Sequence, residues 1–196
     1  MKELTPDQRA EVLERHLHDE GHVDSAAIDR TVAAREDGGG PSPALGARIV
    51  ARAWTDPEFK TRLLANGTAT VSELARQLVP IAVLEDTPER HHVIVCTLCS
   101  CYPGGVLGDP PSWYKSFEYR SRVVREPRAV LAEFGMDVDD GVELRVVDST
   151  SEQRYLVLPL RPEGTEGWPA DELAALVTRD SMIGTGRPLT PNQPTT

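Results

Sequence analysis

The chain has 196 residues, enough for one hydrophobic core with an extension, and its hydrophobic share of 39% is low for a compact domain. The formal net charge of −10 would repel a polyanion, so the sequence predicts that the protein does not bind nucleic acid. No run of about 18 apolar residues is present to span a bilayer, and no apolar signal-peptide core follows Met1. We therefore expect a cytoplasmic protein that does not enter a membrane. The low hydrophobic share indicates that part of the chain packs against a partner.

The N-terminal residues are predicted to form helices with narrow apolar stripes. Residues 5–8 (TPDQ) have the cap residue, the first-turn proline and the glutamine that are typical of a helix N-terminus. A second helix is predicted over about 24–35. The run at 38–43 (GGGPSP) ends the helical pattern, because glycines are flexible and prolines cannot continue a helix. We interpret residues 1–42 as a partner-facing helical arm that ends in a Gly/Pro hinge.

Residues 43–186 are predicted to form one globular domain, followed by a flexible tail at 187–196. Apolar residues at helical spacing predict helices over 44–54, 57–66, 71–78, 113–124, 127–134 and 170–178. Alternating and β-branched residues predict strands over 81–84, 92–95, 142–147 and 155–160. Because helices and strands are grouped and do not alternate strictly, we expect an α+β fold with an α/β/β/α-type layered domain.

All three cysteines lie within six residues, at 96, 99 and 101. A disulfide framework needs cysteines spread along the chain, so this odd and tight cluster indicates metal or redox chemistry. The strand predicted at 92–95 runs directly into Cys96, and a turn after it can direct all three sulfurs at one ion. A structural zinc site normally has four side-chain ligands, and no second cysteine pair is present to complete one.

The remaining ligands of such an ion can come from the backbone. Ser100 is small and adjacent to Cys101, so the amide nitrogens of both residues can approach an ion that the sulfurs already hold. Deprotonated amides are strong-field donors, which suits a low-spin trivalent metal that acts as a Lewis acid with one open position. On the spacing alone, a redox pair with a spare cysteine or an adventitious metal trap is an equally good interpretation.

The residues around the cysteines resemble the nitrile hydratase alpha subunits. The string VCTLCSCYP at 95–103 is similar to the metal-binding signature of that family, which the metal-bearing subunit of thiocyanate hydrolase shares. Further segments that resemble the family lie at 46–64, 85–88, 113–115, 120–135, 145–159 and 161–184. The resemblance therefore covers roughly residues 44–186.

The resemblance implies an enzyme that hydrates a nitrile to an amide at one non-corrin cobalt(III) ion per chain. Cys96 would be the axial thiolate, and Cys99 and Cys101 would be equatorial sulfurs that are oxidised to sulfinic and sulfenic acid, respectively. The amide nitrogens of Ser100 and Cys101 would complete the equatorial plane. The sulfenate oxygen of Cys101 would serve as nucleophile or base, and whether nitrile or water binds the metal first stays open.

Two residues of the signature indicate the metal. Thr97 together with Tyr102 resembles the cobalt branch of the family, because the iron branch usually has Ser and Thr at these positions. We therefore expect cobalt(III), with iron(III) as the less favoured alternative.

Residues outside the signature are further candidates for the site. Gln77, Glu152 and Arg154 fall where the family places polar groups around the metal, and Arg154 could neutralise part of the negative charge of the cluster. Glu152 and Arg154 could equally form an ordinary surface pair. Gly104 and Gly105 stand where the family usually has Trp and Pro, which opens the wall of the pocket and favours a bulky or heteroaromatic nitrile.

Family membership would also imply partners. These are the nitrile substrate, a beta-type nitrile hydratase subunit and a cobalt-delivering activator protein, so that the active assembly is hetero-oligomeric. Thiocyanate hydrolysis is the alternative activity. A metal-binding or redox-sensing protein without catalysis is the alternative from another class.

Overall fold

The computed structural model describes residues 12, 15–21, 24, 42–74 and 79–191. The chain divides into two units, residues 1–40 and 41–196. In the first unit, residues 15–19 are helical, and most of the predicted arm lies outside the described residues. Gln77 and the end of the helix predicted at 71–78 also lie outside them. None of the helices in the described part of the chain is both long and apolar enough to cross a membrane.

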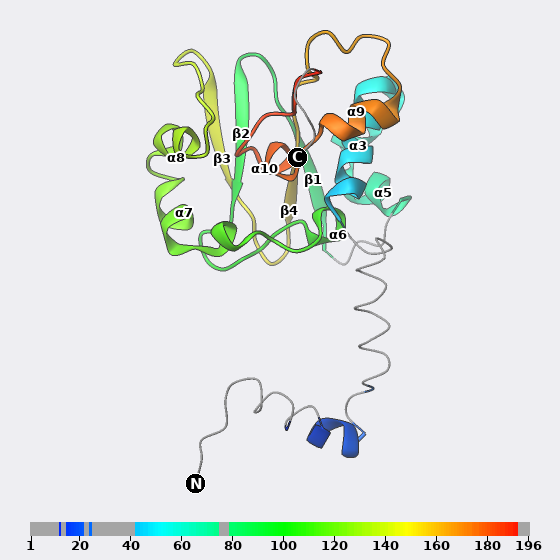
Figure 1. The fold of residues 1–196 in the computed structure, drawn as a ribbon, viewed down its shortest axis with the longest axis vertical. Helices are drawn as coiled ribbons and strands as arrows, with labels where there is room; N and C mark the ends of the chain where they lie inside the picture. The colour runs from blue at the N-terminus through cyan, green and yellow to red at the C-terminus, as the bar shows by residue number, and fades with distance from the viewer. Residues whose placement is uncertain (1–11, 13–14, 22–23, 25–41, 75–78, 192–196) are drawn as a thin grey trace. The chain divides into compact units, whose positions relative to one another are not determined.

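Two pairs of parallel strands lie at the centre of the described part of the second unit (Figure 1). The pairs are β1 (Ile81–Glu85) with β4 (Arg154–Leu158), and β2 (Arg90–Val95) with β3 (Glu143–Asp148). The chain reverses between β1 and β2 at an antiparallel bridge between Thr87 and Arg90. The ends of β2 and β3 and the start of β4 therefore meet at one end of the strands, and the cysteines follow β2 there.

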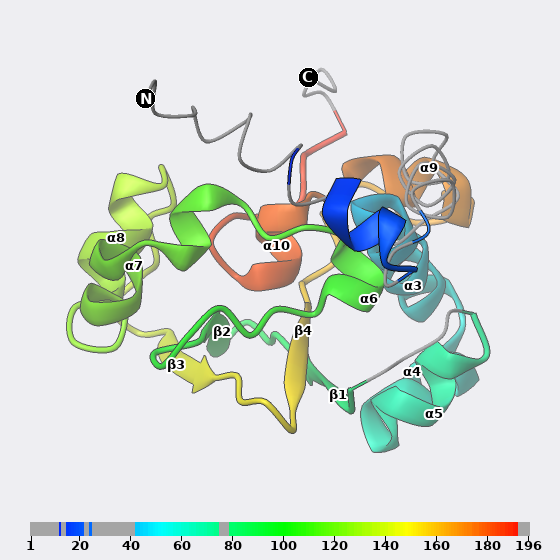
Figure 2. The same ribbon diagram turned by 90° about the horizontal axis from the view of Figure 1, so that it is seen from below.

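Helices lie beside these strands and over one side of them (Figure 2). Helix α8 packs against β3, α4 and α5 pack against β1, α10 contacts β2 and β4, and α3 contacts α9, α6 and α10. The elements are α3 (Pro43–Thr55), α4 (Pro57–Ala65), α5 (Gly67–Ser72), α6 (Gly104–Leu107), the 3₁₀ helix η1 (Ser112–Lys115), α7 (Phe117–Arg122), α8 (Pro127–Glu133), α9 (Ala170–Leu176) and α10 (Arg179–Ile183). The predicted α+β fold is confirmed.

Capping residues explain where two of the predicted helices differ from the structure. Asn66 accepts a hydrogen bond from the Ala69 amide at 3.0 Å and starts α5 at Gly67, four residues earlier than predicted. The helix predicted over 113–124 is broken, because Ser116 is extended and its hydroxyl caps α7 through the Tyr119 amide at 3.1 Å. The short helices α6 and α10 were not predicted, because four or five residues give too little periodicity.

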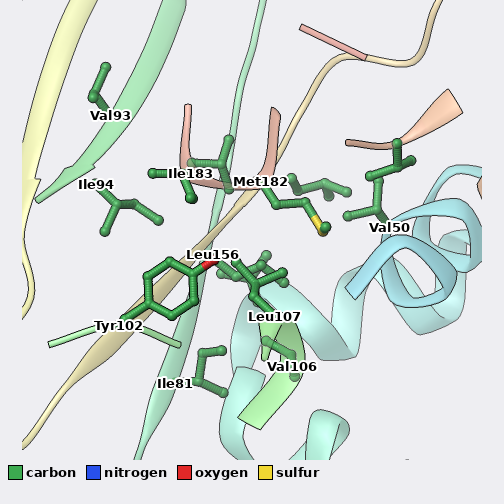
Figure 3. Packing of buried hydrophobic residues seen from close by; sticks show 14 of the residues in the cluster. Val50, Ile81, Val93, Ile94, Tyr102, Val106, Leu107, Leu156, Met182 and Ile183 are labelled. Carbon is green, nitrogen blue, oxygen red and sulfur yellow. The ribbon is translucent and has the colours of Figure 1, made fainter. Parts of the chain in front are cut away.

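The hydrophobic core lies between the strands and helices α3, α6 and α10. Figure 3 shows side chains from β1, β2, β4 and these three helices, and Ile94, Leu107, Leu156 and Met182 are fully buried. Burial of each such side chain contributes roughly 1.5–3 kcal/mol relative to exposure. Beyond this core, the Leu189 amide donates to the Leu176 carbonyl at 2.8 Å, so the first residues of the predicted tail are attached to α9.

A glycine fixes α10 against β2. Gly184 follows α10 with a φ of 87°, and a Cβ atom there would lie 1.8 Å from the carbonyl oxygen of His92. Only glycine allows this approach together with the left-handed backbone.

Candidate metal centre

The three cysteine sulfurs converge where β2 ends. The Sγ atoms of Cys96 and Cys99 lie 3.3 Å apart, those of Cys99 and Cys101 lie 3.2 Å apart, and all three lie within 4.8 Å of one another. Across the residues that the structure describes, no other group of three metal-binding side chains is close enough to hold an ion. The geometry therefore confirms that the turn after β2 directs the sulfurs at one point.

The cluster is buried on one side and open on the other. Cys96 is 1% exposed and Cys101 is 8% exposed, whereas Cys99 lies at the surface next to Leu98, which is 88% exposed. A small molecule can thus approach the sulfurs from the side of Cys99.

Hydrogen bonding and burial shift the pKa values of the Cys99 and Cys101 thiols in opposite directions. Hydrogen bonds from the thiols of Cys101 and Cys96, and further bonds from the amides of Ser100 and Cys101, lower the pKa of Cys99 to about 7. Burial raises the pKa of Cys101 to about 12, although the nearby Arg154 opposes this shift. Cys99 is therefore the more readily ionised of the two, and the thiolate is the form that binds metal.

The donor set fits the kind of metal that the sequence indicates. The amides of Ser100 and Cys101 lie close enough to the Cys99 sulfur to help lower the pKa of its thiol. Their nitrogens are therefore available beside the three sulfurs as further donors to an ion. Soft sulfur donors with strong-field nitrogens suit a low-spin trivalent transition metal better than zinc.

Side chains from η1 and α7 bind carbonyl groups of β2 and the loop. The buried hydroxyls of Tyr114 and Tyr119 donate to the carbonyls of Cys101 (2.8 Å) and Ile94 (2.7 Å). The Trp113 ring packs edge-on against the Tyr119 ring with 4.9 Å between centroids, which fixes this tyrosine. Trp113 and Tyr114 lie in the segment 113–115 that resembles the family, but no local pattern assigns them or Tyr119 to the loop.

Of the three polar candidates Gln77, Glu152 and Arg154, the structure places the side chain of Arg154 at the cysteine loop. Its Nε donates to the carbonyl of Tyr102 at 3.2 Å, and its guanidinium also bonds the carbonyl of Thr150. Glu152 is exposed, and its amide donates to the hydroxyl of Thr150 at 3.3 Å. Gln77 lies outside the described residues. Catalytic roles for these three residues stay predictions.

Two histidines at the beginning of β2 bind elsewhere. The Nδ1 atoms of His91 and His92 lie 2.7 Å and 2.9 Å from the two oxygens of the buried Asp86 carboxylate. The Nε2 of His91 lies 2.8 Å from the carbonyl of Gly184. These residues lie at the beginning of β2, away from the cysteines, so they do not complete a zinc site.

Comparison with known proteins identifies the family. The model of the family "Nitrile hydratase, alpha chain" matches residues 5–186, which includes most of the predicted arm. The cobalt-containing nitrile hydratase subunit alpha of Pseudonocardia thermophila is 53% identical over 187 residues, covering 93% of this chain and 90% of the relative. The thiocyanate hydrolase subunit gamma of Thiobacillus thioparus is 47% identical over 163 residues, covering 76% of this chain and 66% of the relative.

A solved structure agrees with this assignment. A double mutant of the Fe-type nitrile hydratase from Comamonas testosteroni Ni1 superposes with a TM-score of 0.88 at 42% sequence identity, covering 94% of this chain and 91% of that chain. The chain therefore belongs to the nitrile hydratase alpha-chain family.

Proposed function

We propose that this chain is the metal-bearing subunit of a nitrile hydratase that adds water to a nitrile and forms the corresponding amide. The observation that carries the proposal is the convergence of the three cysteine sulfurs on one partly open point, with the amides of Ser100 and Cys101 beside Cys99. The reaction adds one water across the C≡N bond and transfers no electrons. It therefore needs a Lewis acid and a positioned base, and no redox partner.

The chain's own residues would hold the metal and shape its surroundings. Cys96, Cys99 and Cys101 supply sulfurs, and the amide nitrogens of Ser100 and Cys101 supply the remaining protein ligands. When bound, cobalt(III) supplies the Lewis acidity that activates a nitrile or a water. The exposed side at Cys99 admits the substrate, and Arg154 places a positive charge near the buried Cys101.

Cobalt is the metal that the relatives favour. Similar proteins from Pseudonocardia thermophila and Rhodococcus rhodochrous are named cobalt-containing, whereas the Comamonas protein is named Fe-type. The cobalt-containing relatives are 49–53% identical to this chain and the Fe-type structure is 42% identical. Together with Thr97 and Tyr102, this favours one cobalt(III) ion per chain over iron(III).

Assembly with other proteins is part of the proposal. Nitrile hydratase alpha subunits form hetero-oligomers with beta subunits, and we propose a beta-type partner that contacts the cysteine loop at Leu98, as well as an activator protein that delivers cobalt. Leu98, on the exposed part of that loop, offers the apolar surface that a partner would bury. Reduced cysteines before metal insertion also fit the cytoplasm as the compartment.

The substrate is proposed to be a bulky or heteroaromatic nitrile. A Cβ atom built on Gly104 would meet no other atom within 4 Å, so no described residue crowds this position, where the family resemblance places a Trp. Thiocyanate hydrolysis is the second candidate activity, because the Thiobacillus subunit is similar over three quarters of the chain and thiocyanate also presents a C≡N group.

The test combines metal analysis with substrate comparison. The full-length chain is co-produced with its beta-type partner in cobalt medium, and cobalt per chain, intact mass and product formation are measured for acrylonitrile, a bicyclic aromatic nitrile and thiocyanate. We expect about one cobalt per chain, added oxygens and amide formation. Cys96→Ser, Cys99→Ser and Cys101→Ser should each lose cobalt, because each removes a primary ligand. Cobalt-loaded protein that hydrolyses thiocyanate and hydrates no nitrile would establish the alternative activity, and loaded protein inactive on all substrates would refute an enzymatic role.

A further inference from the structure

One side chain of α7 joins the start of its own helix to the cysteine loop. The Nη1 of Arg120 donates to the carbonyl oxygen of Cys99 at 3.1 Å, and its Nε donates to the carbonyl oxygen of Ser116 at 3.4 Å. Ser116 is the cap residue of α7, so the guanidinium bridges a fixed helix end and a surface loop. Nothing in the sequence pattern or the resemblance assigned Arg120 a role in the metal site.

The bonded carbonyl belongs to the peptide group that contains the Ser100 nitrogen. In a trans peptide the C=O and the following N–H point to opposite sides of one plane, and no cis peptide occurs among the described residues. A donor that holds the Cys99 oxygen therefore also fixes the direction of the Ser100 N–H. This direction decides whether the Ser100 nitrogen can face the cysteine sulfurs, as it must do to serve as a ligand.

We propose that Arg120 is a positioning residue of the metal centre, which holds the Cys99 carbonyl so that the Ser100 nitrogen faces the three sulfurs. The inference rests on the proposed function in that it assumes that the amide of Ser100 is a metal ligand. Arg120 itself touches neither substrate nor metal. Its effect passes through the orientation of one peptide group.

The chemistry of arginine suits this bridging role. The planar guanidinium presents donors in a fixed fork, so one side chain can bind two carbonyl oxygens at once. A lysine ammonium at this position can reach one of the carbonyls but lacks the fixed fork. Arg122 on the same helix differs, because it pairs with the carboxylates of Glu126 (2.7 Å) and Glu133 (2.6 Å) and stabilises the helices without contact to the loop.

Arg122 therefore provides a matched control. We would prepare the full-length chain without metal as wild type, Arg120→Met, Arg120→Lys and Arg122→Met, and titrate each with Co²⁺ under anaerobic conditions. Bound cobalt would be measured by equilibrium dialysis and by sulfur-to-cobalt charge-transfer absorption, and the Tm of each metal-free protein would be recorded. The kcat of the assembled enzyme would be measured at matched cobalt content.

Arg120→Met is expected to weaken cobalt binding by about 10- to 100-fold, which is typical of losing a residue that orients a ligand. Its charge-transfer spectrum should also shift, because one ligand is misaligned. Arg120→Lys should recover part of the affinity, and Arg122→Met should bind cobalt within about twofold of wild type even where its Tm falls. Equal cobalt affinity in Arg120→Met and Arg122→Met, with unchanged spectra, would overturn the proposal and leave Arg120 a merely structural role.

Failure of the metal site that the proposed function requires gives a different result. In that case the wild-type chain itself binds no cobalt or shows no charge-transfer absorption. The orientation can then be tested without metal by hydrogen exchange at the Ser100 amide. Faster exchange in Arg120→Met than in Arg122→Met would support the role of Arg120, and identical exchange would refute it.

Discussion

The carboxylate of Asp148 binds Thr97 at two points. One oxygen accepts the Thr97 amide at 2.9 Å and the other accepts the Thr97 hydroxyl at 2.5 Å. Asp148 is the last residue of β3 and pairs in parallel register with Val95, the last residue of β2. This two-point contact fixes the chain where it leaves β2, immediately after the first cysteine.

Replacement of Asp148 should therefore loosen the cysteine loop. Asp148→Ala removes both hydrogen bonds and should lower the free energy of unfolding by about 1–2 kcal/mol, with a larger relative loss of cobalt. Asp148→Asn has the same shape, with one acceptor and one donor in place of two acceptors. It should therefore lose clearly less stability and less cobalt than Asp148→Ala. Chemical denaturation and metal analysis would measure the two effects. Equal cobalt loss in both variants would show that the charge of Asp148, and not its geometry, matters to the site.

The sequence predicted the position of the cysteine cluster well, because its signals are local. A β-branched run leading directly into Cys96 indicates a strand that ends at the loop, and the close spacing of the cysteines permits a single turn. The fold class followed in the same way from grouped helical and strand patterns.

The residues that hold the loop could not be predicted, because they depend on long-range register. Asp148 reaches Thr97 only because β3 runs parallel to β2, and the periodicity of two separate strands contains no information about their pairing. Arg120 reaches Cys99 only because Ser116 interrupts the predicted helix and sets the start of α7. Neither the pairing of the two strands nor the break in the helix has a distinctive local sequence pattern.

Oxidation of the cysteines is expected to be selective. Cys99 should carry a sulfinic acid and Cys101 a sulfenic acid, while Cys96 stays a thiolate, as the family resemblance implies. The exposed position of Cys99 agrees with its carrying more oxygen than the buried Cys101. Peptide mass spectrometry of freshly prepared, cobalt-loaded enzyme handled without oxygen would locate the added oxygens. Finding all three cysteines unmodified in fully active enzyme would contradict this expectation.

Residues 1–42 are expected to serve assembly and not metal binding. The second structural unit begins at residue 41 and contains all three cysteines, and the narrow apolar stripes of the predicted arm suit contact with another subunit. A chain that begins at residue 43 should bind as much cobalt as the full chain, and its affinity for the beta-type partner should fall by at least about tenfold, or about 1.4 kcal/mol. Metal analysis and analytical ultracentrifugation would test the two parts separately. Loss of cobalt from a truncated chain that is still folded would show that the boundary between the arm and the metal-binding domain is wrong.

The size of the substrate should depend on Gly104. The family resemblance places Trp at this position, three residues after Cys101, and here a Cβ atom would meet nothing within 4 Å, so we propose that a ligand uses this space. A bulky nitrile could use that space for contacts that orient its C≡N group, which a small nitrile cannot do. Gly104→Trp should therefore lower kcat/KM for a bicyclic aromatic nitrile by about tenfold, or about 1.4 kcal/mol, and leave kcat/KM for acrylonitrile nearly unchanged.

Gly104→Ala provides the control for this prediction. Alanine tests whether any side chain at the start of α6 disturbs the adjacent loop, since it adds a Cβ atom without filling the space of an indole. Both variants must be compared with wild type at equal cobalt content, because a distorted loop would lose metal first. We expect Gly104→Ala to process both nitriles as wild type does, which would assign the effect of Gly104→Trp to the occupied volume. Equal losses for both nitriles in Gly104→Trp at matched cobalt would instead show damage to the metal centre, and the proposal of a bulky substrate would then have no support.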